Sequence, residues 1–253
     1  MPSKLLRIAV FYVLVIGAWQ LIAQAEVWSA YLFPSPISVF RSLVRNIGNG
    51  MIPDAVQHSV GRLVIGYAIS MVIGMGLGVL TAMSRWADET IGGVVLGLQS
   101  LPSITWLPMA VLWFGLSERA IIFVVLMGST FSIAISARSG MLSLPPLLSR
   151  AVGTLGATRW QMYRYVTLPA MIPAMVQGMK QGWSFAWRSL MAGELLFVVA
   201  GLGHLLDVGR NLNDINMVFG VMLVIIAVGV IVDRLLFGRA EAWVRERWGY
   251  AAA

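Results

Sequence analysis

The chain has 253 residues, of which 58% are hydrophobic and only 11% are charged, and its mean hydropathy is +0.82. Ordinary soluble domains are about 45–50% apolar and about 25% charged, so this composition excludes disorder and argues strongly against a water-soluble globule. Long uninterrupted apolar runs also argue against the alternating pattern of a β-barrel. We therefore expect an all-α polytopic membrane protein.

The formal net charge is +7, from 18 basic and 11 acidic residues. In a membrane protein such an excess is better explained by cationic cytoplasmic loops than by nucleic-acid binding, so no nucleic-acid partner is expected. The chain has no cysteine, and His58 and His204 are far apart in the sequence. This excludes thiol chemistry and disulfides, and no metal site is expected.

A helix needs about 20 apolar residues to cross the hydrocarbon core of a bilayer. Six stretches qualify and would together form one transmembrane domain over residues 1–253: 5–25, 59–83, 91–116, 120–137, 170–199 and 217–236. Basic residues before the first stretch, and Ala23-Gln24-Ala25 at its end, leave a cleaved signal peptide open as an alternative. A short surface helix is expected at 38–47, and the charged tail 238–248 should lie at the membrane interface.

Several residues inside the spans predict particular geometry. Gly74 and Gly78 have the spacing that lets two helix backbones approach closely. Pro102 and Pro108 predict that the third span is broken or kinked. Four serines of the fourth span share one helix face, which fits helix packing and a polar path equally well: Ser129, Ser132, Ser136 and Ser139.

Six spans place both termini on one side of the membrane. That side carries eleven basic residues and the other side five. The two sets are Lys4, Arg7, Arg85, Arg138, Arg150, Arg159, Arg164, Arg234, Arg239, Arg245 and Arg247 on the first side, and Arg41, Arg45, Arg62, Arg119 and Arg210 on the second. The bias predicts that both termini, and the loop at about 139–168, are cytoplasmic.

The loop 139–168 is expected to fold as two short helices around Gly156, which can adopt a left-handed turn. Its sequence resembles the coupling loop of bacterial ABC-importer permeases, which reads Glu-Ala-Ala, then a glycine, then Leu-Pro. The residues that match are Ala151, Gly156, Leu168 and Pro169, whereas Arg150 and Val152 depart from the family pattern. The departure at Arg150 puts in doubt any contact that depends on the acidic group.

The resemblance extends along nearly the whole chain. Four further motifs look like the branch that imports nitrate, sulfonates, taurine and bicarbonate: Phe33-Pro34-Ser35-Pro36, Trp113-Phe114-Gly115, Ala192-Gly193-Glu194-Leu195 and Gly201-Leu202-Gly203. The resemblance implies a type I permease fold in the bacterial cytoplasmic membrane, with a second permease copy, two ATP-binding subunits and an extracytoplasmic substrate-binding protein as partners. ATP and Mg would be bound by the ATPase, and this chain would be non-catalytic and carry no cofactor. The residues implied to couple to the ATPase are Arg150, Ala151, Gly153, Leu155, Gly156, Ala157, Arg159, Leu168 and Pro169.

The residues themselves support the absence of an ATP site. A phosphate-binding P-loop needs a lysine directly after a glycine. The two lysines, Lys4 and Lys180, both lack a preceding glycine. The chain therefore has no such loop.

The fifth span carries ionisable side chains, which should face protein or water because they are costly in hydrocarbon. A helical projection places polar and aromatic residues on one side of this span: Gln177, Lys180, Trp183, Ser184, Trp187, Arg188 and Glu194. We expect this stripe to line the path of a small oxyanion, since arginine binds such groups with a bidentate fork. Glu194 would have a structural or gating role.

Three alternatives stay open at this point. Arg188 and Glu194 could instead stabilise the bundle through other spans, and Lys180 could extend to the interface. The tryptophans would also suit a heteroaromatic vitamin precursor as cargo. A secondary transporter or channel would work without an ATPase, although no internal repeat of the kind common in such proteins is evident.

Overall fold

The computed structural model describes residues 4–29, 31–143 and 152–248, with helices and without strands in that part of the chain. The longer helices are α1 (Lys4–Gln24), α2 (Pro36–Gly48), α3 (Met51–Met83), α7 (Glu118–Leu142), α10 (Leu168–Leu196), α11 (Leu202–Asn211), α12 (Ile215–Val232) and α13 (Gly238–Trp248). The shorter ones are α4 (Arg85–Ala87), η1 (Asp88–Gly92), α5 (Gly93–Gln99), η2 (Ser103–Trp106), α6 (Leu107–Phe114), α9 (Arg159–Met162), η3 (Tyr163–Thr167) and η4 (Asp233–Phe237). The described part of the chain is thus all-α, as predicted.

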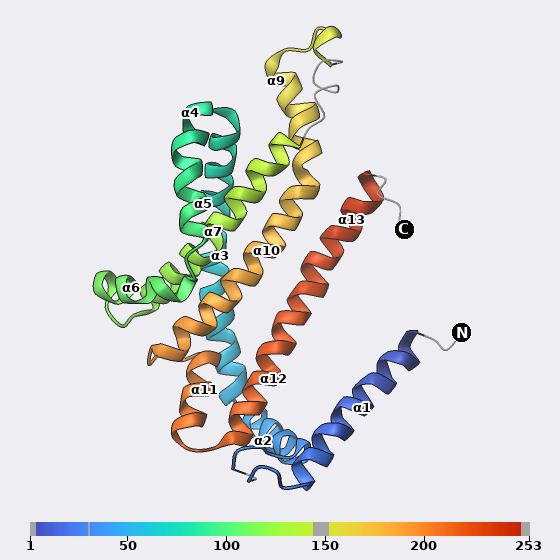
Figure 1. Cartoon of the computed structure of the whole chain (residues 1–253), viewed down its shortest axis with the longest axis vertical. Helices are drawn as coiled ribbons and strands as arrows, with labels where there is room; N and C mark the ends of the chain where they lie inside the picture. The colour runs from blue at the N-terminus through green and yellow to red at the C-terminus, as the bar shows by residue number, and fades with distance from the viewer. Residues whose placement is uncertain (1–3, 30, 144–151, 249–253) are drawn as a thin grey trace.

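Helix α7 packs along α3 and α10 and forms the centre of the bundle (Figure 1). Glycines on α3 let the first pair approach closely, as the spacing of Gly74 and Gly78 predicts. A Cβ atom at Gly74 would lie 2.7 Å from the Thr130 carbonyl oxygen, and one at Gly78 would lie 2.5 Å from that of Ala134. Any side chain at these two positions would force α3 and α7 apart.

The contact between α7 and α10 also depends on small residues. A Cβ atom at Gly178 of α10 would collide with Ser136 of α7, and one at Gly182 would lie 2.6 Å from the Ile133 side chain. Ser129 is fully buried, and its hydroxyl donates to the Val125 carbonyl. Ser129, Ser132 and Ser136 therefore lie in helix packing, whereas Ser139 of the same face is exposed.

The third predicted span is broken, as its prolines predict. The segment Arg85–Gln99 meets Ser103–Phe114 at an angle of 101°. Ser103–Trp106 forms one 3-10 turn after Pro102, and α6 then projects sideways from the bundle (Figure 1). The change of direction follows from Pro102, which removes a backbone donor and disfavours the helical conformation in Leu101.

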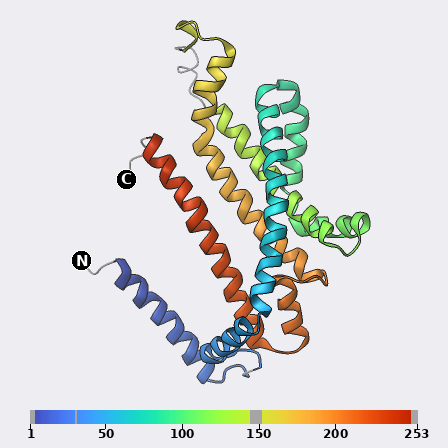
Figure 2. The ribbon, with the colours of Figure 1, turned by 180° about the vertical axis from the view of Figure 1, so that it is seen from behind.

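Within the described residues, four helices are long and apolar enough to cross a membrane, and the bent pair would make a fifth. The four are Leu6–Gln24, Met51–Met83, Glu118–Leu142 and Ile215–Trp248. Helix α10, which covers the predicted span 170–199 as far as Leu196, is long enough at 29 residues but is more polar. It nevertheless lies in the middle of the bundle (Figure 2).

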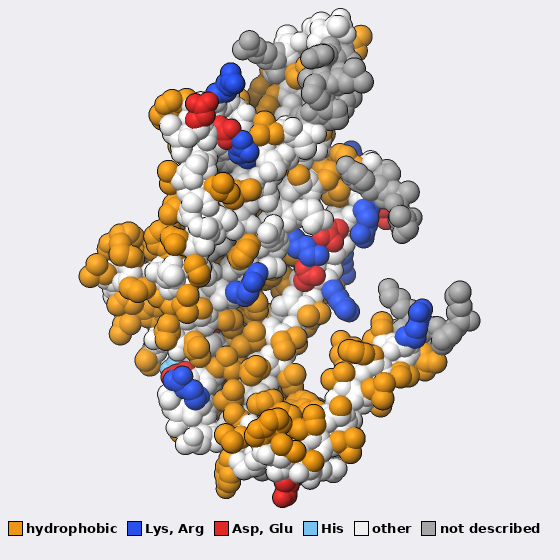
Figure 3. Space-filling model, in the orientation of Figure 1, with side chains coloured by type: hydrophobic (Ala, Val, Ile, Leu, Met, Phe, Trp, Pro, Cys, Tyr) orange, Lys and Arg blue, Asp and Glu red, His pale blue; other side chains and the backbone are white. Residues whose placement is uncertain are grey.

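The N-terminal helix α1 stands apart from the bundle and exposes apolar side chains along its length (Figures 1 and 3). It is fixed at its C-terminal end, where the Trp19 Nε1 donates to the Pro34 carbonyl at 3.0 Å. Ser35 then caps α2 by accepting from the Ser38 backbone N–H, with Pro36 in the first turn. The surface helix expected at 38–47 is thus present as α2.

Helices α12, η4 and α13 form one continuous helix from Ile215 to Trp248. The charged tail 238–248 therefore extends the last apolar helix, and α13 contacts α10. Glu241 on α13 contacts Lys180 and Gln177 of α10, which gives the tail a packing role that its composition does not reveal.

Coupling loop and candidate translocation path

The loop between α7 and α10 turns at Gly156, whose φ is +79°. This left-handed conformation confirms the predicted turn and favours glycine over other residues. Helix α9 then begins with a capping box. The Gln161 side chain accepts from the Thr158 backbone N–H at 2.8 Å, and the Thr158 hydroxyl accepts from the Gln161 N–H at 3.3 Å.

This loop lies at the end of the molecule farthest from α2 and α11 (Figure 1). It exposes large apolar side chains: Leu155 is 85% exposed and Trp160 is 70% exposed. Exposed apolar groups gathered at one tip mark an interaction surface. Of the predicted coupling residues, Arg150 and Ala151 lie outside the described residues, whereas Leu168 and Pro169 form the first turn of α10.

The polar side chains of α10 are divided between two surroundings. The Lys180 Nζ lies 3.1 Å from Glu241 and 3.5 Å from Asp233, and the Gln177 side-chain amide donates to Glu241 at 3.3 Å. Ser184 and Arg188 stay exposed one to two turns further along α10. Lys180 and Gln177 thus join α10 to the last helix, whereas Arg188 lies beside residues of the broken third span and of α7.

Trp183 and Trp187 are buried inside the protomer. The Trp183 ring packs edge-on against Tyr67 at 5.4 Å between centroids and also against Phe237. The Trp187 indole lies against Gly229 of α12. Because both rings are occupied by helix packing, they give no support to a heteroaromatic cargo.

Glu194 has no exposed surface and joins four segments. Its carboxylate accepts from the Ser59 hydroxyl at 2.7 Å, from Arg62 at 2.8 Å and from the Gly203 backbone N–H at 3.1 Å. Arg62 also pairs with Glu118 at 2.7 Å. This buried network ties α3 to the start of α7, the end of α10 and α11, which gives Glu194 a structural position.

Sequence reasoning did not pair Arg62 with Glu194. The signal was present, because an arginine within an apolar helix requires a partner. Its position in the sequence, 132 residues before Glu194, does not say which of the carboxylates it meets.

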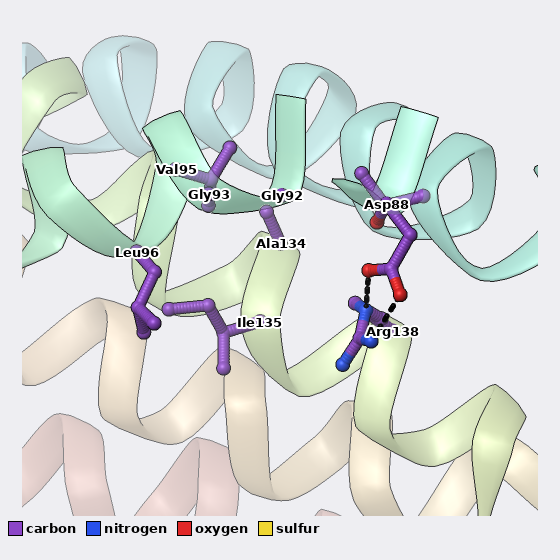
Figure 4. A pocket seen from close by; sticks show the side chains of 9 residues that line it. Asp88, Gly92, Gly93, Val95, Leu96, Ala134, Ile135 and Arg138 are labelled. Atoms are coloured by element: carbon purple, nitrogen blue, oxygen red, sulfur yellow. Dashed lines mark hydrogen bonds and ion pairs between the residues drawn. The ribbon is translucent and has the colours of Figure 1, made fainter. Parts of the chain in front are cut away.

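A second ion pair lies near the opposite end of the bundle, in a pocket of about 280 Å³ (Figure 4). Arg138 of α7 donates from two nitrogens to the two carboxylate oxygens of Asp88 in η1, at 2.5 and 2.6 Å. Asp88 precedes the predicted span 91–116. The hydrogen bond from Arg138, followed by its positive charge, lowers the pKa of the Asp88 carboxyl, although partial burial opposes the shift. The pair fixes the start of the bent helix pair against α7.

Known proteins give the context for these features. The chain is 25% identical to an aliphatic sulfonates transport permease of Bacillus subtilis, with 90% of this chain and 84% of that protein covered. It is 25% identical to the taurine transport permease of Escherichia coli, over 89% and 85% of the two chains. It is 23% identical to the nitrate import permease of a Synechocystis strain, over 92% and 87%.

The fold matches a chain of the inward-facing MetNI methionine ABC transporter with a TM-score of 0.63 and 20% identity. The match covers 77% of this chain and 96% of that one. The bundle is therefore of the type I ABC-importer permease class.

Residues 70–238 match the family of binding-protein-dependent transport system inner membrane components, and the chain belongs to this family. It is a permease subunit of an ABC importer. It is non-catalytic, because ATP hydrolysis in these systems belongs to separate subunits. ATPase subunits and a substrate-binding protein are its partners as a family property, and no cluster of metal-binding side chains is found in the described part of the chain.

Proposed function

We propose that this permease imports a small oxyanion, with sulfonates as the leading class and taurine, nitrate and bicarbonate also in range. The observation that carries the proposal is the likeness to permeases named for aliphatic sulfonates, taurine and nitrate. The exposed guanidinium of Arg188 on α10 supports the proposal, since an arginine guanidinium can donate two parallel hydrogen bonds to the oxygens of an oxyanion.

The topology in this proposal has six spans within one domain, 1–253, and places both termini and the coupling loop in the cytoplasm. The excess of basic residues at that side supports it. The first described residues of α1 and the last of α13 both lie on the coupling-loop side of α2, which agrees with this orientation (Figures 1 and 2).

Two copies of the chain would form the pathway, with the polar face of α10 along it. In this arrangement Arg188 and Ser184 meet the cargo, and Lys180 and Gln177 set the wall of the path through their bonds to Glu241. The buried members of the predicted stripe, which are Trp183, Trp187 and Glu194, hold α10 in position.

The loop around Gly156 would dock into each ATPase, which binds ATP and Mg. The exposed Leu155 and Trp160 supply apolar surface for that contact, and the capping box at Thr158 keeps α9 formed while it is exposed. ATP-driven closure of the ATPases would then move α10 directly, because the chain runs without a break from α9 through η3 into α10.

The test is uptake of radiolabelled ethanesulfonate, taurine and nitrate by proteoliposomes that contain the permease, its ATPase and its binding protein. A double Lys180→Met, Arg188→Met variant should lose most uptake while the complex still assembles. The matched control is Arg239→Met, Arg247→Met, which removes two exposed charges from α13 and should transport normally. Full uptake by the first variant would contradict the proposed path.

A further inference from the structure

A pocket with both polar and apolar lining lies where the third predicted span is broken. It has a volume of about 280 Å³ and is open to the surface. Its rim includes Gln99, Ser100 and Ser103 from the break, and Arg188 from α10. Ligand pockets for drug-sized molecules span about 300–1,000 Å³, so this pocket has the size for a smaller molecule.

The floor of the pocket is built by the close approach of three segments. Gly128 of α7 lies at their meeting point, because a Cβ atom there would collide with Ser189 of α10 and lie 3.2 Å from the Ser103 Cβ. Gly128 therefore lets the break come directly against α10. This packing lets Ser103 and Arg188 line the same pocket.

Arg188 presents its charge to the pocket. Its Nε donates to the Ser184 carbonyl at 3.1 Å, and its guanidinium lies 4.8 Å from the centroid of the Phe185 ring. Both contacts hold the side chain in place and leave the two terminal nitrogens available. No carboxylate among the described residues pairs with Arg188, in contrast to Lys180 and Arg62.

Two neutral donors complete the polar rim. The side chains of Gln99 and Ser103 are half-buried and make no hydrogen bond within the described residues. The Ser100 hydroxyl, by contrast, donates to the Gly97 carbonyl at 2.7 Å. A guanidinium, an amide and a hydroxyl thus line one small space, and each of the three groups can donate hydrogen bonds to the oxygens of an anion.

The rest of the lining is apolar. Leu98 and Leu101 come from the break, Met127 comes from α7, and Phe185 comes from α10. Such a wall accepts a short carbon chain and gives no hydrogen bonds to a bare inorganic ion. A ligand that fits this lining has an anionic head group and a short apolar chain, and a short alkanesulfonate has both.

We propose that this pocket is a binding station for a short alkanesulfonate on its way through the permease. Arg188 holds two sulfonate oxygens with its terminal nitrogens, Gln99 and Ser103 donate to the head, and the carbon chain rests against Met127 and Phe185. The proposal rests on the oxyanion function proposed above, and it specifies the sulfonate head group and the pocket at Arg188 as its binding site.

The test is binding of tritiated ethanesulfonate to the purified permease–ATPase complex without the binding protein, so that the permease alone selects the ligand. Arg188→Gln should weaken binding at least tenfold, Ser103→Ala about threefold, and Arg188→Lys by an intermediate factor. Arg239→Gln is the matched control, because Arg239 is an exposed arginine outside the pocket on α13, and it should bind as the wild type does. Co-elution with the ATPase and an unchanged melting temperature verify that each variant is folded.

Ethanesulfonamide, which has the same shape without the charge, should not displace the label, whereas methanesulfonate should. Wild-type affinity in Arg188→Gln, or equal displacement by the sulfonamide, would overturn the proposal. A wild-type complex that imports nitrate and fails to bind ethanesulfonate would overturn this proposal and leave the oxyanion function standing. A complex that imports no oxyanion would overturn both.

Discussion

Replacing Glu194 by alanine should destabilise the protein by about 3–5 kcal/mol, which is the usual cost of removing one partner from a buried ion pair. Glu194 is fully buried, and Arg62, at 5% exposure, would lose its buried carboxylate partner. The Ser59 hydroxyl and the Gly203 N–H would lose the same carboxylate. Among the described residues, Arg62 would keep the Ala200 carbonyl and the carboxylate of Glu118, which is 60% exposed.

For a chain of this size, a loss of this magnitude corresponds to a fall in melting temperature of roughly 6–20 °C. The assay is thermal unfolding of the detergent-purified protein, followed by tryptophan fluorescence. Glu118→Gln is the matched control. It removes the exposed partner of the same arginine and should cost no more than about 1 kcal/mol.

Two outcomes would refute the reasoning about this network. One is a Glu194→Ala variant that melts within about 2 °C of the wild type, a change worth less than about 1 kcal/mol. The other is an equal loss in Glu118→Gln, which would mean that burial does not determine the strength of the two pairs.

Three further predictions concern other contacts. Gly78→Leu should separate α3 from α7, because its Cβ would already lie 2.5 Å from the Ala134 carbonyl oxygen, and purification should yield aggregated protein. The control is Gly76→Leu, at a position with open space, which should yield monodisperse protein. Gly156→Pro should abolish co-purification with the ATPase while membrane insertion continues, since proline cannot adopt the φ of +79°, and retained co-purification would contradict a docking role for the turn. The lowered pKa of Asp88 means that its ion pair stabilises the protein above the ordinary value of 3.8 and loses this effect as pH falls through the lowered value. The melting temperatures of the wild type and of Asp88→Asn should therefore differ at pH 7 and begin to converge as the pH falls below 3.8, and a difference that grows on acidification would contradict this sign.

Local features of the fold could be predicted because they depend on neighbours in the sequence. The break at Pro102 and the turn at Gly156 follow from the backbone conformations of proline and glycine, and the close approach at Gly74 follows from its missing side chain. The same holds for the surface helix α2, whose start is set by Ser35 and Pro36.

Contacts between distant segments were harder to predict. The polarity of α10 was evident, but the partners of its charges were not, because many basic and acidic residues satisfy the same rule of pairing. Lys180 meets Glu241 because α13 continues α12 along α10. The composition of the tail does not distinguish such a continuous helix from one that lies on the membrane surface. The pocket at Arg188 likewise depends on Gly128, whose role is visible only when three helices are in place.

The central claim is that this chain forms the membrane path of an ATP-driven importer. It is tested most directly by uptake of labelled ethanesulfonate into proteoliposomes, measured with and without the ATPase subunits and with ATP or a non-hydrolysable analogue. The account predicts accumulation only when the permease, the ATPase, the binding protein and hydrolysable ATP are all present. Accumulation by the permease alone would contradict it and would identify a transporter that needs no ATPase.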